Sequence, residues 1–288
     1  MLQQTTVATV TPRFLRFVER WPTVEALAQA PVEQVLQEWA GLGYYARARN
    51  LIACARAVVE SGDFPDDEAG LRRLPGIGAY TAAAIAAIAF GKDATPIDTN
   101  VERVAARFHG LTDKAEIKIA AENMTPAGRA GDFAQAMMDL GSALCRPKAP
   151  LCGTCPLAID CRAFALGMPE AFPAPKPRKL RPQKHGVAWW IEQDGHVWLV
   201  RRPAKGMLGG MAALPGPDWQ DQPLASPPLA RVRHVFTHFA LDLVVSTRSQ
   251  PVGEGWWHPI DGLGEAGLPT LYRRATDAVL AMRTALAA

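Results

Sequence analysis

"LPGIGAYTAAAIAAIAFG", residues 74–91, joins a short glycine-rich turn to an apolar helix. Gly76 and Gly78 permit tight backbone conformations that other residues avoid. A glycine-rich turn that opens a helix also leaves free N–H groups, which suit a phosphate. An ordinary helix–helix turn explains the five residues from Leu74 to Gly78 equally well. The stretch therefore predicts a pair of helices and leaves the function of the turn open.

Apolar residues recur at helical spacing on both sides of this turn, which predicts an all-α domain over residues 1–166. Pro31 suits a first helical turn, and Gly41 and Gly91 suit helix C-terminal caps. The clearest predicted helices cover residues 11–21, 31–43, 46–62, 81–91, 100–111 and 132–144.

A proline-rich basic linker over residues 167–184 follows the helical domain. Proline favours an extended tether there, and a tether that also touches phosphate is the less favoured alternative. Beyond the linker the period changes to that of strands, which predicts a second, α+β domain over residues 185–288. Its predicted strands cover residues 186–192, 196–202, 231–238 and 239–248, and its predicted final helix covers 271–287.

The composition is that of a globular protein, with 49% hydrophobic and 20% charged residues over 288 positions. The formal net charge of +3 permits nucleic acid as a partner without demanding it. No apolar run approaches the length of a membrane span, and the N-terminus lacks the pattern of a signal peptide. We therefore expect a cytoplasmic protein.

Four of the five cysteines, Cys145, Cys152, Cys155 and Cys161, fall within one short loop with the spacing C-x6-C-x2-C-x5-C. In a reducing compartment such a group indicates a metal site rather than disulfides. One CxxC pair flanked by single cysteines favours an iron–sulfur cluster over zinc. Cys54 stands apart in a helical stretch and is expected to be a small core residue.

Asp98 precedes the amphipathic helix of "TPIDTNVERVAARF", residues 95–108. An aspartate at this position commonly caps the helix, and Asn100 could serve in the same way. By themselves, both residues are therefore better explained as caps than as catalysts.

The glycine turn, "PIDTNVERV" and the cysteine loop follow one another in this order. Together they resemble the helix-hairpin-helix DNA glycosylases with an iron–sulfur loop, the endonuclease III superfamily. "MLQQTTVATV", "GLGYYARARN", "FAQAMMDLG" and the added second domain are similar to its adenine-specific, MutY-type family. The resemblance covers almost the whole chain. It implies a monomeric base excision repair enzyme, with one [4Fe-4S] cluster, that hydrolyses the bond to adenine mispaired with 8-oxoguanine or guanine in double-stranded DNA.

The resemblance also implies catalytic roles for particular residues. Asp98 would stabilise the oxocarbenium-like sugar, as carboxylates do in glycoside hydrolysis, and Asn100 would help to organise the site. Tyr80 stands where lyase-active relatives carry a lysine. A phenol cannot form an imine, so a monofunctional glycosylase that leaves an abasic site is expected.

Contacts with DNA are implied in the same way. Gln4 would wedge into the gap left by the flipped adenine, and Tyr44 would intercalate beside 8-oxoguanine. Asp139 would lie near the exocyclic amine of adenine. Gly76 and Gly78 would contact phosphate through backbone N–H groups, and the enzyme would associate with a bacterial-type nucleoid when bound.

The second domain resembles the MutT-like, or Nudix, fold. A Nudix hydrolase needs an R-E-x-x-E-E helix whose glutamates hold Mg²⁺. Here "GMLGGMAALPG" is followed by "PDWQDQPLASPPLA", which contains no glutamate, so the domain is expected to bind rather than to hydrolyse. "HVFTHF" matches the loop that senses 8-oxoguanine, through Phe236, Thr237 and His238, with Thr where the family usually has Ser.

In the family, a catalytic glutamate lies two positions before the methionine of "MLQQT", which here would precede Met1. We expect a mis-assigned start codon rather than a genuine short form. The chain as given is expected to bind lesion DNA weakly and to cleave adenine poorly.

Three alternatives stay open at this point. An endonuclease III-type enzyme for oxidised pyrimidines is the nearest, and Tyr80 and the second domain argue against it. A non-catalytic iron–sulfur protein that only binds damage is the second. A Nudix hydrolase is the least favoured, because the glutamates are missing.

Overall fold

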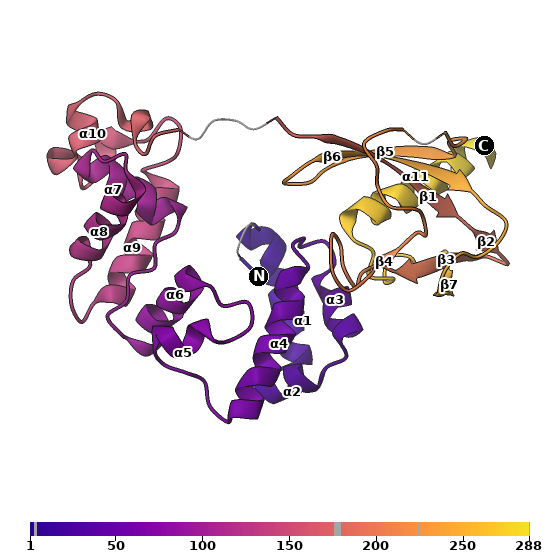
Figure 1. Ribbon diagram of the computed structural model, residues 1–288, viewed down its shortest axis with the longest axis horizontal. Helices are drawn as coiled ribbons and strands as arrows, with labels where there is room; N and C mark the ends of the chain where they lie inside the picture. The colour runs from indigo at the N-terminus through magenta and orange to yellow at the C-terminus, as the bar shows by residue number, and fades with distance from the viewer. Residues whose placement is uncertain (3–4, 176–179, 224, 288) are drawn as a thin grey trace. The chain divides into compact units, whose positions relative to one another are not determined.

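A computed structural model describes residues 1–2, 5–175, 180–223 and 225–287 of the chain. Its contacts divide the chain into two compact units, which we call the first unit (1–59 with 179–288) and the second unit (60–178). The predicted domain bounds, 1–166, 167–184 and 185–288, follow sequence pattern rather than contacts and stay a prediction. Figure 1 gives the element labels that are used below.

The helices of the first unit enclose a cluster of aromatic and aliphatic side chains. The Phe17 ring lies edge-on to Trp21 at 4.7 Å and to Trp39 at 6.3 Å between ring centroids. Met211, from the C-terminal part of the chain, is buried in the same cluster. Four N-terminal helices of this unit surround the cluster: α1 (Val7–Arg20), α2 (Val24–Gln29), α3 (Val32–Trp39) and α4 (Ala46–Ser61).

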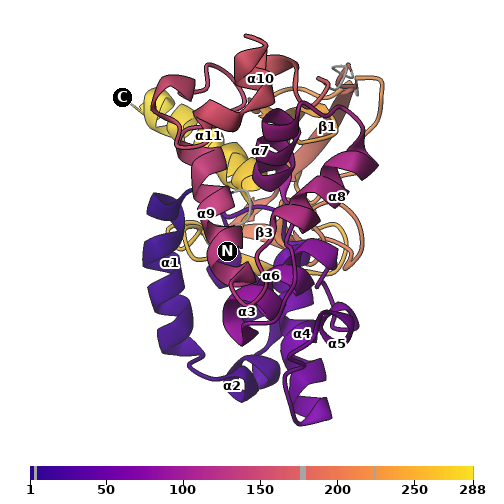
Figure 2. The ribbon, with the colours of Figure 1, turned by 90° about the vertical axis from the view of Figure 1, so that its left-hand side faces the viewer.

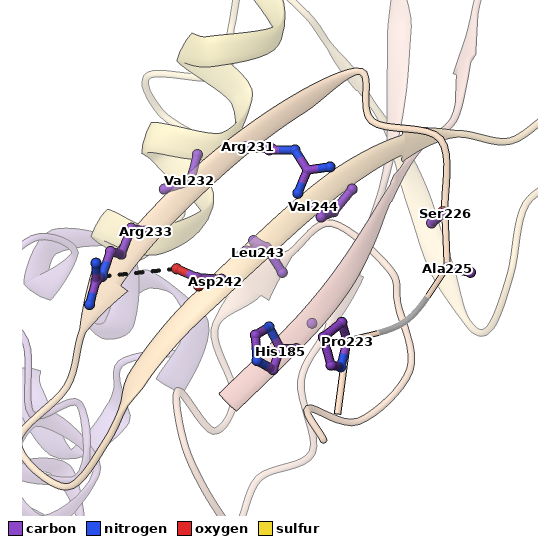
Figure 3. Close-up of a pocket in the computed structure, with 11 residues that line it drawn as sticks. His185, Pro223, Ala225, Ser226, Arg231, Val232, Arg233, Asp242, Leu243 and Val244 are labelled. Carbon is purple, nitrogen blue, oxygen red and sulfur yellow. Dashed lines mark ion pairs between the residues drawn. The ribbon is translucent and has the colours of Figure 1, made fainter. Parts of the chain in front are cut away.

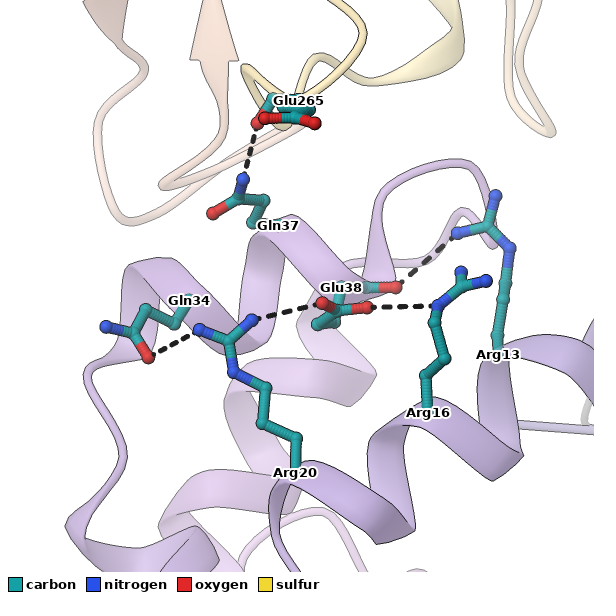
Figure 4. Close-up of polar contacts among 7 residues, drawn as sticks. All are labelled: Arg13, Arg16, Arg20, Gln34, Gln37, Glu38 and Glu265. Atoms are coloured by element: carbon teal, nitrogen blue, oxygen red, sulfur yellow. Dashed lines mark hydrogen bonds and ion pairs between the residues drawn. The ribbon is translucent and has the colours of Figure 1, made fainter.

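Polar side chains on the surface connect α1 to α3 (Figure 4). Arg20 donates to the Glu38 carboxylate at 3.1 Å and to the Gln34 amide oxygen at 2.9 Å. Arg16 forms an ion pair with Glu38 at 3.8 Å. Such exposed pairs contribute little to stability, so the buried aromatic cluster accounts for most of the packing of these helices.

The C-terminal part of the first unit contains two small sheets and a long helix, α11 (Thr270–Ala287), which packs against β5 and β6. One sheet has the strand order β1-β6-β5, with β1 parallel to β6 and β5 antiparallel to it. In the other sheet, β3 pairs with β2, β4 and β7. The strands are β1 (Gln183–Trp190), β2 (Glu192–Gln193), β3 (His196–Arg201), β4 (Ala212–Ala213), β5 (Ala230–Val235), β6 (Ala240–Thr247) and β7 (Gly255–Pro259).

The hairpin predicted around "QDG" is formed by β2 and β3, not by the whole of 186–192. Asp194 and Gly195 both have positive φ, 47° and 75°, as a two-residue hairpin turn with the twist of the strands requires. The chain leaves the first sheet at Ile191, which is fully buried and whose carbonyl accepts from Trp198 N–H at 2.8 Å. Because β1 pairs with β6, it belongs to a different sheet from the β2–β3 hairpin.

All regular elements in the described residues of the second unit are helices, and α7, α8, α9 and α10 gather into one bundle (Figures 1 and 2). Small residues let α6 and α9 approach closely: a Cβ added to Gly131 would lie 2.6 Å from the Ala87 carbonyl oxygen. The α-helices are α5 (Glu68–Arg72), α6 (Ala79–Phe90), α7 (Thr99–His109), α8 (Lys114–Met124), α9 (Ala130–Ala143) and α10 (Arg162–Ala165), with short 3₁₀ turns at Cys152–Thr154, Ala158–Asp160 and Pro169–Ala171.

The predicted fold class is confirmed, since a helical region precedes a C-terminal region of sheets and one long helix. Within the described residues, no helix combines the length and the apolar character needed to cross a bilayer.

Candidate functional site

The glycine turn lies between α5 and α6 in the second unit. Gly76 has φ +77°, a left-handed conformation that favours glycine. Gly78 has φ −84° and ψ 176°, which any residue adopts, so the expectation that both glycines are needed for a tight backbone is wrong for Gly78. A Cβ added to Gly78 would meet nothing within 4 Å. There is therefore free space beside Gly78, at the start of α6.

Asp98 caps α7. Its Oδ1 accepts from the backbone N–H groups of Asn100 and Val101, both at 2.8 Å. Its Oδ2 accepts only from the Asn100 side-chain amide, at 3.0 Å, among the contacts of the described residues. A carboxylate oxygen can accept about two hydrogen bonds, so Oδ2 keeps capacity for another partner.

Asn100 and Arg103 fix the start of α7 against α9. The Arg103 guanidinium is almost fully buried and donates to Asn100 Oδ1 at 2.8 Å and to the Gly141 carbonyl at 2.6 Å. A Cβ on Gly141 would lie 2.5 Å from the Asn100 Cβ, so α9 needs glycine at this contact. The position of Asn100 is thus set by packing as well as by hydrogen bonds.

Tyr80 and Asp139 belong to the helices next to Asp98. Tyr80 donates from Oη to the sulfur of Met138 at 3.3 Å. Burial raises the pKa of Tyr80, and the negative charge of Asp98 raises it further. Asp139 is the next residue on α9 and is exposed. The predicted residues Tyr80, Asp98, Asn100 and Asp139 therefore belong to one region of the second unit.

The cysteine loop packs on α7 through two buried arginines. Arg103 Nε donates to the Cys145 carbonyl at 2.7 Å. Arg107, one turn later, donates to the carbonyls of Arg146 at 2.7 Å and Pro147 at 3.1 Å, and its Nη1 lies 3.4 Å from Cys145 Sγ. The same helix thus has Asp98 as its N-cap and holds the cysteine loop through Arg103 and Arg107.

The four loop cysteines have free thiols and are half-buried. Burial raises the pKa of Cys152, and the charges of Cys145, Cys161 and Cys155 raise it further, so the four sulfur atoms lie near enough to interact. Nevertheless, across the described ranges no group of three or more His, Cys, Asp or Glu side chains is placed so that it could hold a metal ion. Four thiols in one loop fit an iron–sulfur cluster by donor type, and their side chains would have to turn to converge on it.

A cavity of about 570 Å³ in the first unit brings Tyr44 and the loop 236–238 together. It is lined by residues 41–47 and Arg49 before and within α4, by 206–209, by 234–238 at the end of β5, and by 269–271 at the start of α11. The Tyr44 and Thr237 hydroxyls are 3.1 Å apart, although 193 positions separate them in the sequence. Phe236 and His238 line the same cavity, which we call the Tyr44 pocket.

Tyr44 is 47% exposed and has a positive φ of 48°. The Arg47 guanidinium lies 5.5 Å from the centroids of both the Tyr44 and the Trp39 rings. Cation–π contacts of this kind stabilise a ring in one orientation. The Arg47 guanidinium therefore holds the Tyr44 ring, while part of the tyrosine stays exposed to solvent.

A second cavity, of about 630 Å³, lies on the sheet of β1, β5 and β6 (Figure 3). Asp242 is the sole carboxylate in its described lining, and it forms an ion pair with Arg233 at 3.9 Å. The neighbouring segment between β4 and β5 contains no helix in its described residues, 214–223 and 225–229. The described segment thus provides no glutamate helix of the kind that holds Mg²⁺ in a Nudix hydrolase.

One predicted site residue, Gln4, lies outside the described residues. Two site residues were missed by the sequence analysis, Arg103 and Arg107. Their signal was present: the two arginines lie four positions apart and are interleaved with the valines and alanines of an amphipathic helix, and long cationic side chains in such places are seldom buried without partners.

Two family models match the chain. One, described as the HhH-GPD superfamily of base excision DNA repair proteins, matches residues 1–128, and a NUDIX domain model matches residues 186–278.

The relatives are adenine DNA glycosylases. That of Homo sapiens is 34% identical over 76% of this chain and 50% of the relative. That of Mycolicibacterium smegmatis is 41% identical over 59% of this chain and 60% of the relative. The chain spans about half the length of the first curated relatives it matches, between 41% and 61%.

Two solved structures resemble part of the chain. A thermostable thymine-DNA glycosylase has a TM-score of 0.53 at 29% identity, covering 57% of this chain and 80% of the other. Endonuclease III in a non-covalent complex with DNA has a TM-score of 0.51 at 28% identity, covering 57% and 79%.

Proposed function

The chain belongs to the helix-hairpin-helix superfamily of base excision DNA repair proteins and, within it, to the adenine DNA glycosylase (MutY) type, and on this premise we propose that it removes adenine mispaired with 8-oxoguanine or guanine from double-stranded DNA. The adenine would be flipped out of the stack before its N-glycosidic bond is broken. The protein would act as a monomer on the DNA of a bacterial-type cytoplasm.

The arrangement at the start of α7 carries this proposal. Bond cleavage leaves an electron-poor sugar that a carboxylate can stabilise. The Asp98 carboxylate is held rigidly by three hydrogen bonds, and the spare capacity of Oδ2 would face that sugar. Asn100 would keep Oδ2 in position, and the exposed Asp139 would accept from the adenine amine.

Tyr80 supports a glycosylase without lyase activity. A lyase needs an amine that attacks the sugar, whereas the Tyr80 hydroxyl donates to Met138 and has a raised pKa. A monofunctional reaction that leaves an intact abasic site is therefore proposed.

The experiment measures abasic-site formation in duplexes with adenine opposite 8-oxoguanine, guanine or thymine, and in one with an oxidised pyrimidine. We expect slow cleavage, in the order 8-oxoguanine, guanine, then thymine, and none of the oxidised pyrimidine. Release of the pyrimidine instead of adenine would assign the chain to endonuclease III-type chemistry. Tight lesion binding without abasic sites in any duplex would make it a binding protein.

Cys145, Cys152, Cys155 and Cys161 would hold one [4Fe-4S] cluster. When bound, the cluster would cross-link the loop and fix its backbone for contact with DNA. The Arg107 guanidinium supports this assignment, because its Nη1 lies 3.4 Å from Cys145 Sγ and a cation there would stabilise an anionic cluster bound by four thiolates.

The Tyr44 pocket would recognise the 8-oxoguanine that is left after the adenine is flipped. Tyr44 would stack on the base from one side, and Phe236, Thr237 and His238 would contact it from the other. The short distance between the Tyr44 and Thr237 hydroxyls supports this proposal, because it brings two distant segments to one cavity. Threonine retains the hydroxyl that this role needs.

A further inference from the structure

The loop 236–238 is supported by an aromatic cluster that adjoins the Tyr44 pocket through Phe236. The loop is the tip of the β5–β6 hairpin, closed by a bond of 2.8 Å from Phe236 N–H to the Phe239 carbonyl. The rings of Phe236 and Phe239 lie 4.9 Å apart. Trp219 packs against both, stacked on Phe236 at 5.4 Å and tilted to Phe239 at 5.9 Å. Trp219 does not line the Tyr44 pocket.

The position of Trp219 is itself fixed from several sides. The next residue, Gln220, exchanges two backbone hydrogen bonds with His185 of β1, at 2.7 and 2.9 Å. Gly186 provides room for the indole, because a Cβ there would lie 2.6 Å from Trp219 Cδ1. The Arg202 guanidinium lies 4.9 Å from the Trp219 ring centroid and donates to Tyr272 Oη at 3.2 Å.

We propose that Trp219 is a positioning residue for lesion recognition: it holds the Phe236–His238 loop in the conformation that meets Tyr44. The inference rests on the proposed function of that loop. Trp219 belongs to the segment that replaces the glutamate helix of a Nudix hydrolase. Instead of providing glutamates for Mg²⁺, this segment contacts the β5–β6 hairpin through Trp219 and would hold the tip of the hairpin in place.

Contacts with Trp219 would preorganise the tip of the β5–β6 hairpin. Thr237 and His238 are exposed at a hairpin tip, where the backbone has few partners of its own. Ring contacts of Trp219 with Phe236 and Phe239 on either side of the tip restrict the tip before DNA arrives. A loop that is already ordered loses less entropy on binding, so the preference for the lesion should depend on these contacts.

Three variants of the full chain test the proposal, with one control. Trp219→Ala removes the ring, and Trp219→Phe keeps an aromatic contact. Gly186→Ala keeps Trp219 but places a methyl group in its niche. Trp189→Ala is the control, since Trp189 lies on β1 of the same sheet and packs under Arg248 at 4.6 Å.

The first measurement is amide hydrogen exchange of the peptide over residues 233–240, which requires no DNA. Trp219→Ala and Gly186→Ala should both speed exchange in this peptide, whereas Trp219→Phe and Trp189→Ala should leave it near the wild-type rate. Unchanged exchange in both of the first two variants, with folded far-ultraviolet spectra, would overturn the proposal.

The second measurement is the ratio of affinities for duplexes with 8-oxoguanine or guanine opposite a non-cleavable adenine analogue. Loss of two ring contacts should lower this ratio by about tenfold in Trp219→Ala, with the guanine duplex bound about as before. Trp219→Phe should restore most of the ratio. If exchange rises but the ratio is unchanged, Trp219 does not set the lesion preference and the proposal is wrong.

A wild-type ratio near one would instead refute the proposed function of the loop. The exchange measurement would still decide whether Trp219 positions it, so the two failures can be told apart.

Discussion

Asp98 has two roles that one substitution can separate. Its Oδ1 caps α7, and its Oδ2 is proposed to face the sugar. Asp98→Asn retains an acceptor for the cap, so the free energy of unfolding should fall by less than about 1 kcal/mol. Glycosylase activity should fall by about 10²–10³-fold, because the negative charge is lost. Single-turnover kinetics and urea unfolding measure the two effects.

Asp113 offers a matched control. Its Oδ1 caps α8 with bonds of 2.8 Å from Ala115 N–H and 3.0 Å from Glu116 N–H, the same geometry as at Asp98. Asp113→Asn should therefore change neither stability nor activity appreciably. Equal activity of Asp98→Asn and Asp113→Asn would leave Asp98 as a cap and nothing more.

At the scale of elements, the cysteine loop should depend on its four thiols and not on cysteine content in general. Cys152→Ser should lower the iron bound per chain and weaken DNA binding, because the loop loses a ligand and its fixed backbone. Cys54→Ser provides the control: Cys54 is buried in α4, away from the loop in sequence. Iron analysis of anaerobically purified protein decides the matter, and zinc without iron would contradict the cluster assignment.

The two glycines of the turn between α5 and α6 should respond differently. Gly76→Ala should cost about 1–2 kcal/mol of stability, because φ is positive there. Gly78→Val should fold normally, since its backbone is extended and its surroundings are open. If the turn contacts phosphate, Gly78→Val should weaken binding to lesion and matched duplexes alike, by about tenfold.

Gly264→Val is the control for Gly78→Val, because a Cβ on Gly264 also meets nothing within 4 Å. Fluorescence anisotropy with both duplexes gives the comparison. A loss confined to the lesion duplex would mean that the turn reads a base rather than a phosphate.

Local patterns predicted several helices well, because a helix depends mainly on residues within a few positions of one another. The pattern over 46–62 corresponds to α4, Ala46–Ser61, and Gly91 does end α6 with a φ of 63°. Pairing between distant segments was not visible in the same way. β1 pairs in parallel with β6, more than fifty positions away. The strand that was predicted over 186–192 as one arm of the "QDG" hairpin is therefore divided between β1 and β2.

The candidate site shows the same division. Asp98 and the four cysteines stand in local motifs, and their neighbourhood could be predicted. The contacts that fix them could not, because Arg107 reaches a loop about forty positions away and Tyr44 meets Thr237 across 193. Contacts of this kind depend on how distant segments pack together in three dimensions, which local sequence patterns do not reveal.

At the scale of the whole molecule, the C-terminal part of the chain contributes to the stability of the first helices. Met211 follows the segment 206–210 and is almost fully buried among side chains of α1, α3 and α4. Two hydrogen bonds add to this packing, from Arg49 to the Gly209 carbonyl and from the Gln37 amide to the Glu265 carbonyl. Deleting the residues after Lys184 to test lesion preference would also remove this support, so point substitutions are the cleaner test.

Met211→Ala should therefore destabilise helices that are more than 150 positions away in sequence. Truncating a buried methionine leaves a cavity and costs about 2–5 kcal/mol. Amide exchange should rise in α1 and α3 as well as around Met211 itself. Met137→Ala is the matched control, because Met137 is also almost fully buried but packs with α7 and α8 in the second unit. It should raise exchange in α7 and α9 and leave α3 unchanged. If Met211→Ala left exchange in α3 at the wild-type rate, the C-terminal part would not support the first helices in solution, and the Tyr44 pocket would lack the fixed walls on which its proposed recognition of 8-oxoguanine depends.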